Sequence, residues 1–137
     1  MKVFLDTNVL VDYLNKREPF FADAAQVIDI CKRNDITGVV SSLSVINTAY
    51  IMRKAYTKDS LLLKISWLTN RFEVSPINRE SIKKAIAFYP SDFEDAVRYF
   101  SAQQAEADLI ITRDADGFQQ FDLPVMTPTE FLARCAE

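Results

Sequence analysis

Two aspartates stand where short apolar runs stop. Asp6 follows the run VFL at residues 3–5, and Asp114 comes just after the run DLIIT at residues 108–112. Short continuous apolar runs of this kind are typical of strands buried on both faces of a parallel sheet. In such sheets ligands bind beyond the carboxyl ends of the strands. We therefore expect both carboxylates at a binding site on that edge.

Three further polar residues are expected at the same edge. Asp92 and Asp95 begin the predicted helix that precedes DLIIT, and Asn47 lies one turn into the helix that follows VVSS. Carboxylates gathered together repel one another and raise each other's pKa, and a bound divalent cation relieves that repulsion. Oxygen-only ligands suit Mg²⁺ or Mn²⁺, which keep water and phosphate oxygens in their coordination shell. The sequence therefore predicts an open carboxylate site for a hard metal, suited to phosphoryl chemistry.

Each of these acids also has a purely structural interpretation. Asp92 fits the N-cap of a helix, and Asp95 fits its first turn, where an acid interacts favourably with the helix dipole. Asp114 and Asp116 fit turn positions, and Asp6 fits an Asx-turn or a cap for the next helix. Under this interpretation the chain is a structural or partner-binding subunit, in which replacing these acids changes stability and no metal binds.

The composition excludes several kinds of catalysis. The 137 residues include no histidine, which excludes Ser-His-Asp and Cys-His catalysis and every metal site built on histidine. Two cysteines are too few to complete a usual zinc site. The net charge is −3, whereas a protein that binds nucleic acid by counterion release alone is normally basic. If the chain acts on nucleic acid, we expect a cation between its acids and the phosphates.

The order of strands and helices can be read from the apolar pattern. Short apolar runs predict strands, and longer segments with one apolar face predict helices. Strands are expected at 2–5, 36–42, 73–77, 108–112 and 124–127, and helices at 8–15, 19–31, 43–56, 58–72, 78–89, 92–107 and from 128 onward. Thr127, Pro128 and Glu130 fit the N-cap, N1 and N3 positions of the last helix. This alternation predicts a three-layer α/β/α fold with a short parallel sheet.

No linker, repeat or low-complexity segment divides the chain, so we expect one domain over residues 1–137. No apolar run approaches the ~18 residues that a membrane-spanning helix needs. Only three apolar residues separate Lys2 from Asp6, too few for the apolar region of a signal peptide. We therefore expect a cytoplasmic protein that does not enter the membrane.

Three motifs cover nearly the whole chain. They are VFLDTNVLVDYL at the start, SSLSVINTAYIMRK in the middle and DFEDAVRYFSAQQAEADLIITRDADGF late in the sequence. With these motifs in this order, the chain resembles a PIN domain, the fold of many bacterial toxin ribonucleases, including the VapC-type toxins of toxin–antitoxin pairs. The resemblance implies a metal-dependent phosphodiesterase that usually acts on RNA and uses three or four acidic residues.

The family's acids can be matched position by position. Asp6 matches the first acid, Asp95 the third and Asp114 the fourth, where family members have Asp or Asn. The middle motif usually has Glu, and the matching residue here is Asn47, which offers a carbonyl oxygen but no charge. The implied catalytic set is Asp6, Asp95, Asp114 and Asn47, and the implied metal ligands are Asp6, Asp95 and Asp114, with Asp116 and Asp92 as stand-ins.

A second departure lies before the late phenylalanine. The family often has Asp there, whereas this chain has Gly117, with Asp116 one residue earlier. Because Asn47 stands where the family usually has Glu, one carboxylate is lost, which weakens metal binding and can abolish turnover. The first alternative is therefore a catalytically weakened or inactive PIN-like module that binds nucleic acid or protein. A phosphatase with Asp6 as nucleophile is disfavoured, because DTNVL lacks a second aspartate two residues on.

In the active interpretation, the Mg²⁺ or Mn²⁺ ion lowers the pKa of a bound water, so that hydroxide attacks the RNA phosphodiester without a histidine base. The expected substrate is single-stranded or structured RNA. Thr7, Asn8 and Thr112 are expected to orient the carboxylates through hydrogen bonds. Arg113, Arg53 and Lys54 are candidates for phosphate contacts, and a solvated surface position explains each of them as well.

The expected protein partners follow from the resemblance and from two apolar segments. The resemblance implies an antitoxin protein. The helix at residues 9–14 and the segment LLLKISWL at 61–68 offer apolar surface for a homodimer or for an antitoxin, or they belong to the core. We expect a homodimer that binds RNA and an antitoxin.

Overall fold

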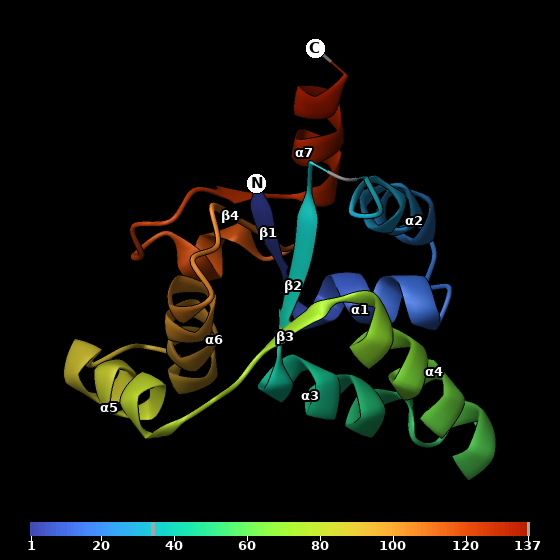
Figure 1. Ribbon diagram of the computed structural model, residues 1–137, viewed down its shortest axis with the longest axis horizontal. Coiled ribbons are helices and arrows are strands. Elements are labelled where there is room, and N and C mark those ends of the chain that lie inside the picture. The colour runs from blue at the N-terminus through green and yellow to red at the C-terminus, as the bar shows by residue number, and fades with distance from the viewer. Residues whose placement is uncertain (34, 137) are drawn as a thin grey trace.

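The centre of the molecule is a five-stranded parallel sheet with the strand order β3-β2-β1-β4-β5. A computed structural model describes residues 1–33 and 35–136 of the chain (Figure 1). The strands are β1 Lys2–Leu5, β2 Thr37–Ser41, β3 Glu73–Ser75, β4 Leu109–Ile111 and β5 Val125–Met126. All five lie within or at the bounds expected from the sequence.

Helices connect the strands, as the alternating pattern predicted. In the described part of the chain they are α1 Thr7–Leu14, α2 Phe21–Ile30, α3 Ser42–Met52, α4 Lys58–Arg71, α5 Arg79–Phe88, α6 Phe93–Gln104 and α7 Pro128–Cys135. Thr127 and Glu130 form the capping box expected at the start of α7. One element was not predicted, the 3₁₀ turn η1 at Ala115–Phe118, which follows Asp114.

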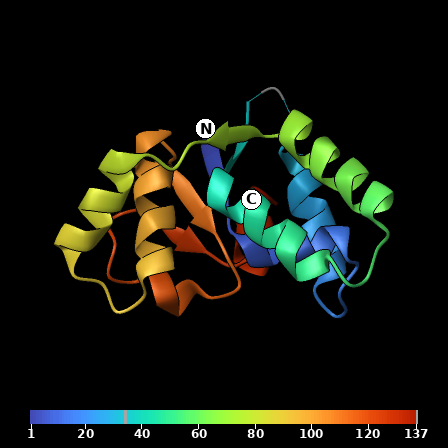
Figure 2. The ribbon, with the colours of Figure 1, turned by 90° about the horizontal axis from the view of Figure 1, so that it is seen from below.

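The sheet is apolar on both faces, and successive residues of β1 enter different cores. Val3 and Leu5 pack in a cluster with α1, α2, α4 and α7, whereas Phe4 packs in a second cluster with α5, α6 and η1. Figure 2 shows α5 and α6, in yellow and orange, on one side of the sheet and α1 to α4, in blue to green, on the other. The predicted three-layer α/β/α fold is confirmed.

The strand register brings the ends of β1, β2 and β4 to one edge of the sheet. Leu5 pairs with Ile111, and Phe4 pairs with Val39. The backbone N–H of Asp6 extends this ladder by donating to the carbonyl of Ile111 at 3.0 Å. Side chains that follow these three strands therefore meet at the carboxyl edge. No helix in the described residues has both the length and the apolarity of a membrane span.

Candidate functional site

Asp6 occupies the junction between β1 and α1, and both of its carboxylate oxygens are engaged. Oδ1 accepts from the backbone N–H of Thr7 at 2.8 Å, which makes Asp6 the N-cap of α1. Oδ2 accepts from the hydroxyl of Thr112 at 2.8 Å and from the side-chain amide of Asn8 at 3.5 Å. The residue is 5% exposed. The capping interpretation of Asp6 is thus correct, and it leaves the carboxylate held in one orientation at the carboxyl edge.

Thr112 connects the loops that follow β1 and β4. Its hydroxyl, which is completely buried, donates to Asp6 and accepts from the amide of Asn8 at 3.0 Å and from the backbone N–H of Asp114 at 3.0 Å. Asn8 in turn accepts from the backbone N–H of Arg113 at 3.1 Å. These contacts match the orienting role predicted for Asn8 and Thr112. The Thr7 hydroxyl instead donates to Ser44 at 2.9 Å, so Thr7 reaches Asp6 only through its backbone.

Helix α6 brings a second group of acids to Asp6. Asp92 is the N-cap of α6 and accepts from the backbone N–H of Asp95 at 3.0 Å, as the structural interpretation predicted. The carboxylate of Asp95 turns toward the site and is only 16% exposed. Burial, followed by the neighbouring charges of Asp92 and Asp6, raises the pKa of Asp95 to about 6, while Arg98 acts in the opposite direction. The charge of Asp6 thus contributes to the raised pKa of Asp95.

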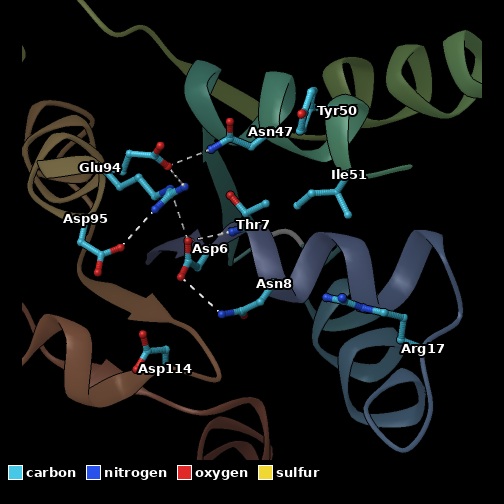
Figure 3. Close-up of a pocket in the computed structure, with 11 residues that line it drawn as sticks. Asp6, Thr7, Asn8, Arg17, Asn47, Tyr50, Ile51, Glu94, Asp95 and Asp114 are labelled. Carbon is cyan, nitrogen blue, oxygen red and sulfur yellow. Dashed lines mark hydrogen bonds and ion pairs between the residues drawn. The ribbon is translucent and has the colours of Figure 1, made fainter. Parts of the chain in front are cut away.

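Arg98, one turn further along α6, contacts three carboxylates at once. Its Nη1 lies 3.1 Å from Oδ1 of Asp95, its Nη2 3.1 Å from Oε2 of Glu94, and its Nε 3.6 Å from Oδ1 of Asp6. Figure 3 shows the three acids, with Glu94 and Asp95 on one side of the site and Asp6 at its centre. The Arg98 side chain is 10% exposed. Neither Arg98 nor Glu94 was predicted from the sequence to take part in the site. The available signal was their spacing, since acids three and four residues before an arginine lie on the same helix face.

Asn47 reaches the same group from α3. Ser41, the last residue of β2, caps that helix by accepting from the backbone N–H of Ser44. Helix α3 therefore begins directly after β2. The side-chain amide of Asn47 donates to Oε2 of Glu94 at 3.4 Å. The residue at the position of the family's usual Glu therefore faces the acids, as predicted, and it contacts a glutamate from α6.

Asp114 and Asp95 lie on either side of Gly117. A Cβ atom at position 117 would come within 2.9 Å of Oδ2 of Asp114 and 3.1 Å of Oδ2 of Asp95. Only glycine leaves this space free without displacing a carboxylate. The absence of a side chain at position 117 thus lets both carboxylates lie close to the backbone there.

These side chains line an open cavity of about 390 Å³ between α1, α3 and α6, which we call the carboxylate cavity; its lining includes Asp6, Asn47, Glu94, Asp95, Arg98 and Asp114. Asp92 and Asp116 were predicted as stand-in ligands, and neither is part of this lining. Asp92 caps α6, and the exposed Asp116 accepts from the side-chain amide of Gln119 at 3.0 Å.

The donors in the carboxylate cavity are chemically suited to a hard divalent metal. Four carboxylates and the amide oxygen of Asn47 offer only oxygen ligands, which Mg²⁺ and Mn²⁺ prefer. In the side-chain arrangement of residues 1–33 and 35–136, no three carboxylates or thiols surround a common metal position. Arg98 pairs with three of the four acids, so a metal requires these side chains to reorient.

Two of the basic residues considered for phosphate contacts, Arg113 and Arg53, have other partners. Arg113 lies 2.6 Å from Oδ2 of Asp12 and stacks over Phe20 at 3.8 Å, while Arg17 approaches Asp12 at 2.9 Å. Asp12 is 1% exposed. Arg53 stacks on its neighbour Tyr50 at 3.7 Å. Arg113 and Arg17 therefore form an ion-pair network around the buried Asp12, which was not predicted from the sequence.

Comparisons with known proteins agree with the resemblance. Residues 2–116 match the family described as PIN domain. The curated protein Ribonuclease VapC1 of Aquifex aeolicus (strain VF5) is 30% identical over 138 residues, covering 97% of this chain and 94% of that protein.

Solved structures are similar in fold. A chain of VapBC2 from Rickettsia felis, bound to a DNA fragment from their promoter, has a TM-score of 0.73 at 17% identity and covers 93% of this chain and 98% of its own. VapBC-1 from nontypeable Haemophilus influenzae gives a TM-score of 0.73 at 22% identity, with 94% and 99% coverage. A toxin–antitoxin complex from Klebsiella pneumoniae gives 0.71 at 20% identity, with 92% and 97% coverage.

Proposed function

The chain belongs to the PIN-domain family, and from that premise we propose that it is a metal-dependent endoribonuclease that hydrolyses RNA at the carboxylate cavity. One observation carries the proposal: acids from three separate segments, Asp6, Asp95 and Asp114, line one open cavity at the carboxyl edge of a parallel sheet. The name of the relative from Aquifex aeolicus supports RNA as the substrate.

In the proposed mechanism, Asp6, Asp95 and Asp114 hold one or two Mg²⁺ or Mn²⁺ ions, and Asn47 contributes its amide oxygen. Such an ion, when bound, supplies the Lewis acidity that turns water into a nucleophile and offsets the negative charge that develops on the phosphate. Thr112 and Asn8 keep the carboxylate of Asp6 in a single orientation. Gly117 carries no side chain that would displace the carboxylates of Asp95 and Asp114.

Glu94 is proposed to supply the carboxylate that Asn47 lacks. Its Oε2 accepts from the Asn47 amide at 3.4 Å and lies 3.1 Å from Nη2 of Arg98. The other guanidinium nitrogens of Arg98 contact Asp6 and Asp95. A carboxylate from α6 therefore lies beside the position where the family usually has one on α3. This geometry supports retained catalysis, although α3 contributes only an amide.

A PIN-like binding module without catalysis is the second candidate. Two observations favour it, the uncharged Asn47 at the expected position of a glutamate and the pairing of Arg98 with three of the acids. Such a module binds RNA or a protein partner without cutting RNA.

The proposed biological context is the toxin of a toxin–antitoxin pair. The relative bears a VapC name, and the similar folds include VapBC and toxin–antitoxin complexes. We expect an antitoxin protein as partner and a homodimer as the assembly. Exposed apolar side chains on α3 and α4, among them Ile46, Ile51 and Leu63, provide surface for such contacts.

The test combines metal binding with RNA cleavage. Calorimetry with Mn²⁺ is compared between the wild type, Asp6→Asn and the control Asp122→Asn, which alters an exposed aspartate outside the carboxylate cavity. Single-stranded and hairpin RNA oligonucleotides are then incubated with each protein and Mn²⁺. We expect binding and cleavage in the wild type and the control, and neither in Asp6→Asn. Metal and RNA binding without cleavage in the wild type identifies the binding module instead.

A further inference from the structure

The guanidinium of Arg98 lies where a cation for the carboxylate cavity belongs. Each of its three nitrogens faces a different acid: Nη1 faces Asp95, Nη2 faces Glu94, and Nε faces Asp6. Glu94 and Asp95 come from the same helix as Arg98, whereas Asp6 comes from the end of β1. One positive charge is thus shared by three negative charges from two parts of the fold.

The hydrogen bonding of Arg98 is incomplete. Its Nε is buried and has no hydrogen-bond partner among the described residues, because Oδ1 of Asp6 lies 3.6 Å away. Glu94 and Asp95 each accept one hydrogen bond from Arg98, so neither pair has the bidentate geometry that makes arginine–carboxylate pairs strong. The residue is 9% exposed, so the Nε–H group is shielded from solvent and has no hydrogen-bond acceptor among the described residues. Arg98 therefore neutralises these acids only in part.

A divalent ion and this guanidinium need the same carboxylate oxygens. Mg²⁺ binds oxygen ligands at about 2.0–2.1 Å in near-octahedral geometry, which turns the carboxylate lone pairs toward the ion. Two cations placed within the same group of acids also repel each other. The three acids can therefore bind either the guanidinium or the metal ion tightly, but not both at once.

We propose that Arg98 is a built-in competitor of the divalent metal, which pairs with Asp6, Glu94 and Asp95 in the metal-free protein and releases them when the metal binds. This inference rests on the proposed function, because it concerns the same cavity and the same ion. It assigns Arg98 a role in setting metal affinity. It also explains how the protein remains folded with closely spaced acids when no metal is bound.

The first experiment measures Mn²⁺ affinity by calorimetry in the wild type, Arg98→Gln and Arg98→Lys. The glutamine removes the competing charge, so we expect affinity to rise by roughly tenfold, within the range of about 5–150-fold that typical coupled sites show. The lysine keeps a cation and is expected to stay close to the wild type. Unchanged or weaker binding by a folded Arg98→Gln protein overturns the competition.

The second experiment uses the wild type alone and does not depend on a variant that folds. The side-chain Nε–H signal of Arg98 is followed by NMR while Mg²⁺ is added, with the backbone N–H of Thr7 as a reporter of Asp6. We expect both signals to change together as the guanidinium leaves the acids. A response at Thr7 with no change at Arg98 overturns the proposal.

Different results contradict the proposed metal site and the proposed competition by Arg98. If neither the wild type nor Arg98→Gln binds Mn²⁺ at millimolar concentration, the metal site itself is wrong, and both proposals fail. If both proteins bind equally and Asp6→Asn does not bind, the metal site stands and only the competition by Arg98 fails.

Discussion

The hydroxyl of Thr112 donates a 2.8 Å hydrogen bond to the carboxylate of Asp6 across 106 positions of the sequence. It connects the ends of β1 and β4, the two neighbouring strands whose carboxyl ends border the carboxylate cavity. The same hydroxyl accepts from Asn8 and from the backbone N–H of Asp114. One buried oxygen thus orients the first predicted ligand and the loop that carries the last one.

Replacing Thr112 with Val is expected to impair both stability and metal binding. Two donors lose their acceptor and Asp6 loses a donor, and an unsatisfied buried polar group costs about 1–3 kcal/mol. Loss of a partner that orients a metal ligand typically lowers metal affinity about 10–100-fold. Urea unfolding and Mn²⁺ calorimetry measure the two effects. Thr112→Ser keeps the hydroxyl and serves as the control; equal affinity in Thr112→Val and Thr112→Ser contradicts the orienting role.

Glu94→Gln is expected to weaken Mn²⁺ binding, because Glu94 is proposed to supply the carboxylate that α3 lacks. The matched control is Glu80→Gln, since Glu80 lies in the first turn of α5 just as Glu94 lies in the first turn of α6, and Glu80 is exposed outside the carboxylate cavity. Calorimetry compares the two variants. If both bind Mn²⁺ as the wild type does, Glu94 is only a surface partner of Arg98.

Asn47→Glu is expected to strengthen metal binding and to weaken the metal-free fold. The new carboxylate lies beside Glu94, which now accepts a hydrogen bond from the Asn47 amide at 3.4 Å. Without metal, the two like charges repel each other; with metal, both become ligands. Thermal unfolding with and without Mn²⁺ tests both effects, and Asn47→Gln provides an uncharged control of the same length. Lower Mn²⁺ affinity in Asn47→Glu contradicts the prediction.

Asp95 is expected to make the metal-free protein less stable as the pH rises from about 4 to about 6. Burial and the charges of Asp92 and Asp6 raise its pKa from the ordinary 3.8 to about 6, against the opposing effect of Arg98. Between these values the folded protein holds a proton that the unfolded chain releases, so raising the pH favours unfolding. Urea unfolding across this range measures the slope.

The variant Asp95→Asn removes this titration. Its stability is expected to depend less steeply on pH than that of the wild type between about pH 4 and pH 6. The control Asp122→Asn is expected to keep the wild-type slope. The same slope in all three proteins means that Asp95 does not titrate as proposed.

Arg113→Gln is expected to lower the free energy of unfolding and to leave RNA binding unchanged. Asp12 is 1% exposed and contacts both Arg113 and Arg17. Removing Arg113 leaves this buried carboxylate with a single partner, at a cost of about 1–3 kcal/mol. Urea unfolding and RNA titration measure the two properties. Weaker RNA binding with unchanged stability shows instead that Arg113 contacts phosphate.

Much of the fold follows from local patterns. Short apolar runs and one-sided helices indicate their elements because burial requires those periods, and Thr127 with Glu130 marks the start of α7 by satisfying free N–H groups. The alternation of strands and helices then implies a parallel sheet, whose carboxyl edge collects Asp6, Asn47, Asp95 and Asp114. These residues could be placed together from the sequence, because parallel strands connected by helices have their carboxyl ends at the same edge of the sheet.

The partners within that edge could not be found in the same way. The spacing of Glu94, Asp95 and Arg98 shows that they share a helix face, but only the packing of α6 beside β1 brings Arg98 to Asp6. The pairing of Asp12 with Arg113 spans 101 positions. Such contacts depend on the relative positions of whole elements, which side-chain packing decides and local spacing does not encode.

The two aspartates around η1 illustrate the same division. The sequence places Asp114 and Asp116 in one short turn, and by sequence alone either is a candidate metal ligand. The turn of η1 directs Asp114 toward Gly117 and Asp95, whereas Asp116 faces Gln119 at the surface. The sequence therefore determined which chemistry gathers at the edge of the sheet, and the tertiary structure decided which side chains take part, because that choice depends on directions set by packing across the fold.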